Sequence, residues 1–352
     1  MKRLTLLVLM VFTMQLAFSQ TDVVQFLKGG KADASKLVQA YLEPYAFALG
    51  DGLNNGWCSS AASHKLFGFD LTVSLSGIQI PESALSFDIS KLNLSNMVVE
   101  SGGNIAPTIA GKDVAGPKIL VKDNEGNSIA TFNTPNGLAM DLVPVPMAQV
   151  GFGLLPYTDV IGRYVPEKTY SYNNDQMKLG FWGVGVKHNF LKWIPVLKQL
   201  PLDASIFASY SEVNAQSELS FTPEDYGVDN VSITFTNNEG QFLKVKTNTS
   251  KFGLIVSKKL SIITVFAGIA QSTSESTIDL VGKYPVLTKV DNGGYEITNE
   301  SALIDPIALK FKNHNISMDA GLRVKLAFLS IFGSISKSEY TSYNAGLSLS
   351  VR

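Results

Sequence analysis

Charged side chains alternate with apolar ones near the C-terminus, and they are the residues of this 352-residue chain best placed to do chemistry. Successive side chains on a strand point to opposite faces, so these charges would share the wet face of a sheet. Mixed charges inside a narrow barrel either pair and stiffen it, which we favour, or act as a selectivity filter. The candidate residues of such a lumen, where a substrate would also pass, are Trp57, Asp70, Lys251, Asp319, Arg323 and Lys325.

Residue types that support catalysis or metal binding are sparse. The three histidines, His64, His188 and His314, lie far apart in sequence, and no GxSxG-type nucleophile motif occurs. A single cysteine, Cys58, rules out an intramolecular disulfide and a CxxC metal or redox site. The acidic groups of the long polar segments lack the EF-hand pattern and are expected to be solvated: Asp225, Asp229, Asp291, Glu296 and Glu300. We therefore predict no enzyme activity, no cofactor and no metal site.

The strands that must position these side chains are clearest in residues 315–352, which alternate regularly in three consecutive segments. Leu322, Ile331 and Leu347 fall on the oily faces, and serines fall on the opposite faces. Each segment has roughly the 9–12 residues that a tilted strand needs to cross a bilayer. A membrane barrel would expose the three apolar residues to lipid, whereas a soluble β-sandwich would bury them between two sheets. We favour the barrel, in which the last strand would pair with the first.

The lengths of the connections give a second indication. Tight turns are expected at 156–159, 258–259 and 327–328, whereas 219–243 and 272–307 read as long polar loops. Outer-membrane barrels have short periplasmic turns and longer external loops. The fold class predicted is therefore all-β, a transmembrane antiparallel β-barrel with an even strand number of about 10–14. Within it, the apolar residues of 177–189 change parity along the strand, which predicts a β-bulge near Gly183.

The N-terminal part predicts export followed by a helix. Lys2 and Arg3, an apolar run and Ala17-Phe18-Ser19 form a secretory signal over residues 1–19, cleaved near Ser19/Gln20. Ala34–Leu49 has apolar residues at helical spacing, with a kink expected at Pro44 and a stop at Gly50. This helix would either plug the lumen or cap its mouth. The expected organisation is 1–19 signal peptide, 20–62 helical plug or cap, and 63–352 barrel.

Composition limits the partners. Only 17% of the residues are charged and the formal net charge is −1, which argues against nucleic-acid binding. An exported, disulfide-free chain rich in strands is typical of a bacterial outer-membrane protein. The expected partners are outer-membrane lipids, the barrel-assembly machinery during biogenesis and hydrophobic small molecules, with the chain as a monomer.

Three short motifs resemble those of an uncharacterised outer-membrane barrel family common in Bacteroidota: Gly183-Val184-Gly185-Val186-Lys187-His188, Trp193-Ile194-Pro195 and Leu200-Pro201. The Ala17-Phe18-Ser19-Gln20 region is similar to the same group. More loosely, the layout resembles FadL-type channels for fatty acids and other hydrophobic compounds. The shared points are the helix before the first strand, the loop from Asn54-Asn55-Gly56 to Ala61-Ala62, and Gly68-Phe69-Asp70-Leu71.

The FadL resemblance implies passive uptake of hydrophobic small molecules, with a plug that shifts or a strand that kinks to open a path. The alternative is a non-transporting structural or surface-interaction barrel that acts through external loops. Its motivation is the length and polarity of residues 222–241 and 272–307.

Overall fold

The computed structural model describes residues 25–123, 125–172, 175–196, 199–219, 231–236, 240–290 and 294–351. The expected signal peptide, Asp225, Asp229, Asp291 and Arg352 lie outside these residues. No helix in the described part of the chain is long and apolar enough to cross a membrane.

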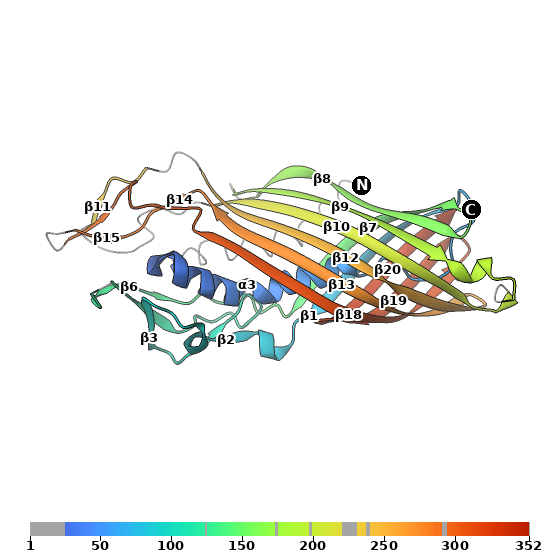
Figure 1. The fold of residues 1–352 in the computed structure, drawn as a ribbon, viewed down its shortest axis with the longest axis horizontal. Coiled ribbons are helices and arrows are strands. Elements are labelled where there is room, and N and C mark those ends of the chain that lie inside the picture. The colour runs from blue at the N-terminus through green and yellow to red at the C-terminus, as the bar shows by residue number, and fades with distance from the viewer. Residues whose placement is uncertain are drawn as a thin grey trace.

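Ten antiparallel strands close into one barrel, which confirms the predicted fold class and gives the lower end of the predicted strand range (Figure 1). Strand β1 closes it by pairing with β20 on one side and with β7 on the other. The barrel strands are β1 (Phe69–Gln79), β7 (Leu142–Leu155), β8 (Thr158–Tyr172), β9 (Asp175–Asn189), β10 (Asp203–Leu219), β12 (Gln241–Leu260), β13 (Ile263–Val281), β18 (Ile307–Leu326), β19 (Leu329–Lys337) and β20 (Thr341–Val351).

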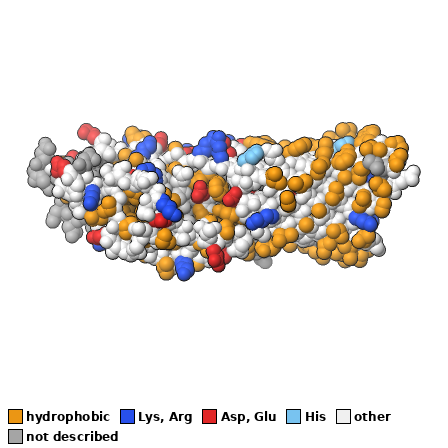
Figure 2. Space-filling model, turned by 60° about the horizontal axis from the view of Figure 1, so that its bottom comes forward, with side chains coloured by type: hydrophobic (Ala, Val, Ile, Leu, Met, Phe, Trp, Pro, Cys, Tyr) orange, Lys and Arg blue, Asp and Glu red, His pale blue; other side chains and the backbone are white. Residues whose placement is uncertain are grey.

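The outer surface of the barrel carries an apolar band. Leu322, Ile331 and Leu347 are 54%, 48% and 52% exposed, so they are not buried between two sheets. The inward neighbours Ser330 and Ser348 are 0% and 1% exposed. Figure 2 shows apolar side chains covering the half of the molecule around the short turns, and charged side chains gathering over the other half. Apolar side chains on the outside and hydroxyl groups on the inside are the pattern of a transmembrane barrel.

Aromatic side chains mark both edges of this band. On the side of the long connections, the ring centres of Trp182 and Tyr210 lie 5.4 Å apart. On the side of the short turns, Tyr157 and Trp193 lie 5.6 Å apart. Such girdles sit at the two membrane–water boundaries of a barrel. Exposed members are Tyr164, Trp182, Tyr210, Phe252 and Tyr343 at one edge and Phe67, Trp193 and Phe328 at the other.

A charge placed in this band should cost stability. We expect Leu347→Lys to destabilise the barrel by about 2–4 kcal/mol, because the ammonium would face hydrocarbon. Ala308→Lys is the matched control, since Ala308 is exposed on β18 beyond the aromatic edge and opposite Asp279. Urea unfolding in lipid vesicles measures both variants. Equal stabilities of the two variants would contradict the membrane placement of the band.

Several strands run far past the band. Strands β12, β13 and β18 each contain 19 or 20 residues, so much of the sequence expected as loop at 219–243 and 272–307 continues the sheet. Likewise β8 runs to Tyr172. Outward ion pairs between neighbouring strands, such as Lys310–Glu275 and Lys246–Glu212, cover the extended part and give it a polar surface. The polarity that suggested loops belongs to strands in water.

The extended end of the barrel supports a second folded body, which we call the head: residues 25–47, 80–123, 125–141, 231–236, 281–290 and 294–306. It holds short elements: η1 (Gln25–Gly29), η2 (Glu82–Ala84), β2 (Ser86–Asp88), η3 (Ile89–Leu92), β3 (Met97–Ser101), β4 (Ile105–Pro107), β5 (Lys118–Lys122), β6 (Ser128–Asn133), β11 (Val231–Ile233), β14 (Lys283–Tyr284), β15 (Thr288–Lys289), β16 (Tyr295–Ile297) and β17 (Leu303–Ile304). Strands β5 and β6 pair as an antiparallel hairpin. Helix α3 (Lys31–Asn54) crosses from the head into the barrel (Figure 1).

Helix α3 continues past Gly50, where a stop was expected, to Asn54. The glycines serve packing instead. A Cβ on Gly50 would lie 2.4 Å from the Ser274 hydroxyl oxygen, and one on Gly52 would lie 2.5 Å from a Val145 methyl group. The helix therefore touches the barrel wall closely where it enters the lumen.

The bulge expected near Gly183 is absent from the pairing of β9 with β10, which is regular. The irregularity lies in the neighbouring strand β8, between Val165 and Lys168. Leu179 and Phe181 point inward against an apolar cluster around α3, while Val184 points outward to lipid. The apparent change of phase arose because both faces of this strand meet apolar surroundings at different heights.

Candidate functional site

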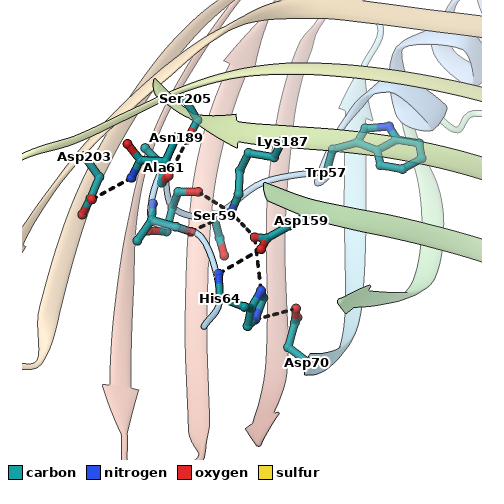
Figure 3. A network of polar contacts seen from close by, with 12 residues as sticks. Trp57, Ser59, Ala61, His64, Asp70, Asp159, Lys187, Asn189, Asp203 and Ser205 are labelled. Carbon is teal, nitrogen blue, oxygen red and sulfur yellow. Dashed lines mark hydrogen bonds and ion pairs between the residues drawn. The ribbon is translucent and has the colours of Figure 1, made fainter. Parts of the chain in front are cut away.

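The lumen of the barrel is filled by the N-terminal part of the chain. Helix α3 ends inside it, and residues 55–67, which we call the strap, continue to the short-turn end where β1 begins (Figure 3). Asp51 accepts a hydrogen bond from the Tyr340 amide at 3.0 Å, and the Asn54 side chain donates to the Thr273 carbonyl at 3.1 Å. The end of α3 and the strap thus lie inside the lumen, while the first turns of the helix belong to the head.

Arg163 on β8 locks the plug. Its guanidinium donates to the carbonyl oxygens of Leu53 (3.0 Å) and Asn55 (2.8 Å) and to the side-chain oxygen of Gln149 (3.0 Å). It also lies 3.8 Å from the centre of the Trp57 ring, a cation–π contact. The carbonyls at the end of α3 carry partial negative charge, which compensates a cation that is only 2% exposed.

Further anchors hold the strap along its length. Lys187 donates to the carbonyl oxygens of Ser60 (3.2 Å) and Ala62 (2.7 Å). The Ser205 hydroxyl donates to the Ala61 carbonyl at 2.6 Å, and the Ala61 amide donates to the Ser257 hydroxyl at 3.0 Å. These inward side chains replace the hydrogen bonds that a strand partner would give the irregular strap.

A charged cluster closes the strap near its end. His64 lies between two carboxylates, with Nε2 3.1 Å from Asp70 and Nδ1 3.1 Å from Asp159 (Figure 3). Lys187 lies 3.1 Å from the same Asp159, which is 1% exposed. The cluster therefore joins the strap to β1, β8 and β9.

The position of His64 gives this attachment a pH dependence. Burial disfavours the imidazolium, but the hydrogen bonds that the ring donates to Asp159 and Asp70 outweigh burial and raise the pKa of His64. A raised pKa in the folded state means that His64 stabilises the attachment fully below its unfolded pKa of about 6.5, and that this stabilisation is lost as the pH rises through the raised value.

We expect the strap to open more often as the pH rises through that range. The rate at which a small maleimide labels Cys58, divided by the rate for the denatured chain at the same pH, measures the opening. The sole cysteine makes the readout specific. His64→Gln should flatten the profile, and a profile identical to that of the unmutated chain would contradict this role.

The predicted lumen residues lie in the lumen, as contact partners of the plug or of each other. Trp57 is 3% exposed under Arg163, and Asp70 contacts His64. Lys251 and Asp319 pair at 2.9 Å. Arg323 and Lys325 line the cavity described next. Arg163, Lys187 and Asp159 also face the lumen but were not predicted to do so. The signal that could have found them is an isolated charge with inward parity in a strand whose outward residues are mostly apolar.

A cavity of about 280 Å³ lies between the strap and the wall at the short-turn end. Most of its lining residues are polar or charged, and they come from the strap and nearly every strand of the barrel. Five basic side chains line it against two acidic ones, Asp70 and Asp159. Within the described ranges, no group of histidine, cysteine and acidic side chains is arranged to hold a metal ion.

Comparison with solved structures finds other barrels, all distantly similar. The translocator domain of the autotransporter NalP from Neisseria meningitidis is 10% identical, with a TM-score of 0.33, over 89% of this chain and 99% of that one. The attachment invasion locus protein Ail of Yersinia pestis is 6% identical, with a TM-score of 0.25, over 82% and 100%. The P. putida toluene transporter TodX is 9% identical, with a TM-score of 0.26, over 81% and 67%. Similarity this low does not bear on function.

A search of curated proteins finds no match. A family model, by contrast, matches residues 1–351. The chain belongs to the family of unknown function DUF6588.

Proposed function

We propose that this protein is a bacterial outer-membrane barrel closed by its own N-terminal segment, which presents the head at the cell surface for contact with a partner. The observation that carries the proposal is the buried lock of Arg163 on α3 and the strap. A lumen filled by packed helix and hydrogen-bonded strap serves as an anchor, and the seven charged side chains that line the cavity beneath it do not suit an apolar solute. The proposal includes no enzyme activity.

The orientation follows from the turns. Strands β12 and β13 are joined by two residues and β18 and β19 by two, at the end away from the head. Short turns face the periplasm in outer-membrane barrels, which puts the head outside the cell. The expected signal peptide, lipid partners and monomeric state belong to the same proposal.

The head is well built for a contact role, because it has its own apolar core. Phe26, Tyr41 and Tyr284 are 0–1% exposed in a cluster that joins α3, the 80–141 segment and the extended strands. A folded body of this kind can keep a binding surface in one shape, whereas separate loops would have to be ordered at each encounter.

Labelling of intact cells tests the orientation. Lys91 lies in the head with its side chain 81% exposed, so Lys91→Cys in a Cys58→Ser background should react with a membrane-impermeant maleimide in intact cells. Labelling that appears only after the cells are broken would overturn the proposal.

A second candidate, uptake of hydrophobic small molecules, is favoured by one feature of the wall. Strands β7 and β8 pair only over Gln149–Leu155 and Thr158–Arg163, so residues 142–148 and 164–172 are not joined. Pro144 and Pro146 lie in the stretch of β7 that pairs with β1 but not with β8, and prolines in sheets occur at such edges. Apolar side chains of α3, β7 and β9 lie behind this seam.

Uptake of a hydrophobic dye separates the two candidates. Cells with the protein, cells lacking it and cells with a chain deleted for residues 21–60 are compared. Equal uptake in cells with the intact protein and cells lacking it supports the anchor and rejects the channel; uptake that the intact protein raises above the cells lacking it, and that the deletion changes, supports the channel.

A further inference from the structure

The cavity at the short-turn end is lined by more cations than carboxylates, five basic side chains against Asp70 and Asp159. Lys259 of β12 is paired in register with Thr264 of β13, and Thr264 with Arg323 of β18. Adjacent strands lie about 4.8 Å apart, so the backbones of Lys259 and Arg323 are about 10 Å apart and both side chains reach the space over Thr264. All three side chains line the cavity.

The hydrogen bonds of Arg323 involve hydroxyl groups. Its guanidinium donates to the side chains of Ser59 and Ser330 at 3.1 Å and of Ser350 at 3.5 Å. Among the described residues, it forms no ion pair with a carboxylate. The hydroxyls hold the guanidinium beside the cavity without neutralising it.

The two acids of the cavity already have partners. Asp159 contacts Lys187 and His64, and Asp70 contacts His64 and accepts hydrogen bonds from Thr72 (2.6 Å) and Ser348 (3.0 Å). Asp70 is paired in register with Ser350, to which Arg323 donates, so it also offsets part of the charge of Arg323. Five basic side chains against these two carboxylates still leave the cavity with an excess of positive charge.

We propose that this cavity binds a small anion that carries a phosphate or carboxylate group, held by Arg323 and Lys259 and entering from the short-turn end. A planar guanidinium matches two oxygens of such a group, and a lysine adds a point charge. The cavity has room for a ligand of several non-hydrogen atoms. Lys259 is exposed, so the cavity can be reached from that end.

The test uses the full-length protein in detergent, with inorganic phosphate and succinate as separate probes. Cys58 lines the same cavity, so a bound anion should slow its reaction with a small maleimide. Slowing by phosphate alone, by succinate alone or by both supports the proposal and identifies the group. Failure of both to act beyond sodium chloride at equal ionic strength overturns it.

Variants locate the site. Arg323→Gln should weaken the binding of the protecting anion about tenfold or more, since a charge-assisted hydrogen bond to the anion is lost. The concentration of anion that halves the labelling rate of Cys58 measures this change. Lys259→Gln gives a second reading that leaves the Ser59 contact of the strap intact. Lys337→Gln is the control: it removes an exposed lysine at the opposite end, where Lys337 donates to the Thr341 hydroxyl. Protection that is unchanged in both Arg323→Gln and Lys259→Gln contradicts the assignment.

Discussion

Arg163→Ala should release the strap and raise the rate of Cys58 labelling about a hundredfold, which corresponds to about 3 kcal/mol. The reason is that the substitution leaves the Leu53 and Asn55 carbonyls and the Gln149 side chain without their buried donor, and it removes the cation over Trp57. Buried acceptors that lose a charged donor are among the costliest losses in a folded protein.

Lys178→Ala is the matched control. Lys178 also belongs to a barrel strand and pairs with Glu167, but both side chains are about half exposed. An exposed pair contributes little, so the labelling rate of Cys58 should stay near that of the unmutated chain. A labelling rate for Arg163→Ala that equals the control would show that the lock is dispensable.

Tyr41→Ala should loosen the head while leaving the barrel folded. Tyr41 is 1% exposed, its ring meets Phe26 edge-on at 6.1 Å, and its hydroxyl donates to the Asn136 carbonyl at 2.7 Å. Losing both the ring and the hydrogen bond should cost about 3–5 kcal/mol. Limited proteolysis should then cut within residues 80–141 much faster than before.

Two further variants separate the contribution of the Tyr41 ring from that of its hydrogen bond and provide a control. Tyr41→Phe keeps the ring and should show about 1–2 kcal/mol of the loss. Gln39→Ala changes an exposed position of the same helix and should behave like the unmutated chain. Migration of the unheated protein in gels reports whether the barrel stays closed. Loss of the closed barrel in Tyr41→Ala would show that head and barrel do not fold separately.

The C-terminal strands could be predicted from sequence because their two faces meet two different solvents over their whole length. Leu347 points to lipid and Ser348 to the lumen, so an alternation of period two gives both their strand and their side. The same held for Asp319 and Lys251, whose inward parity placed them where they pair.

The direction of the side chains could not be predicted for the strands near the helix, because the lumen there is apolar. Val143, Val145 and Met147 point inward against α3 and are 1–6% exposed, so an oily inner face is not distinguishable from an oily outer face by sequence. The helix position was open for the same reason. Nothing local to Trp57 indicates that Arg163, more than a hundred residues later, covers its ring.

Residues 219–243 and 272–307 were predicted as loops because loops and strands that lie in water have the same polar composition. Glu275 and Lys310 face outward on neighbouring strands and pair, so they suit a sheet beyond the membrane as well as a loop. Only the register shows that the sheet continues.

Single-channel recording of the purified full-length protein in a planar lipid bilayer tests the central claim most directly. A barrel closed by α3 and the strap should insert without stable conductance steps, while Arg163→Ala should show openings. Regular open steps from the unmutated protein would contradict the account, because an ion-conducting path cannot coexist with a lumen filled as described.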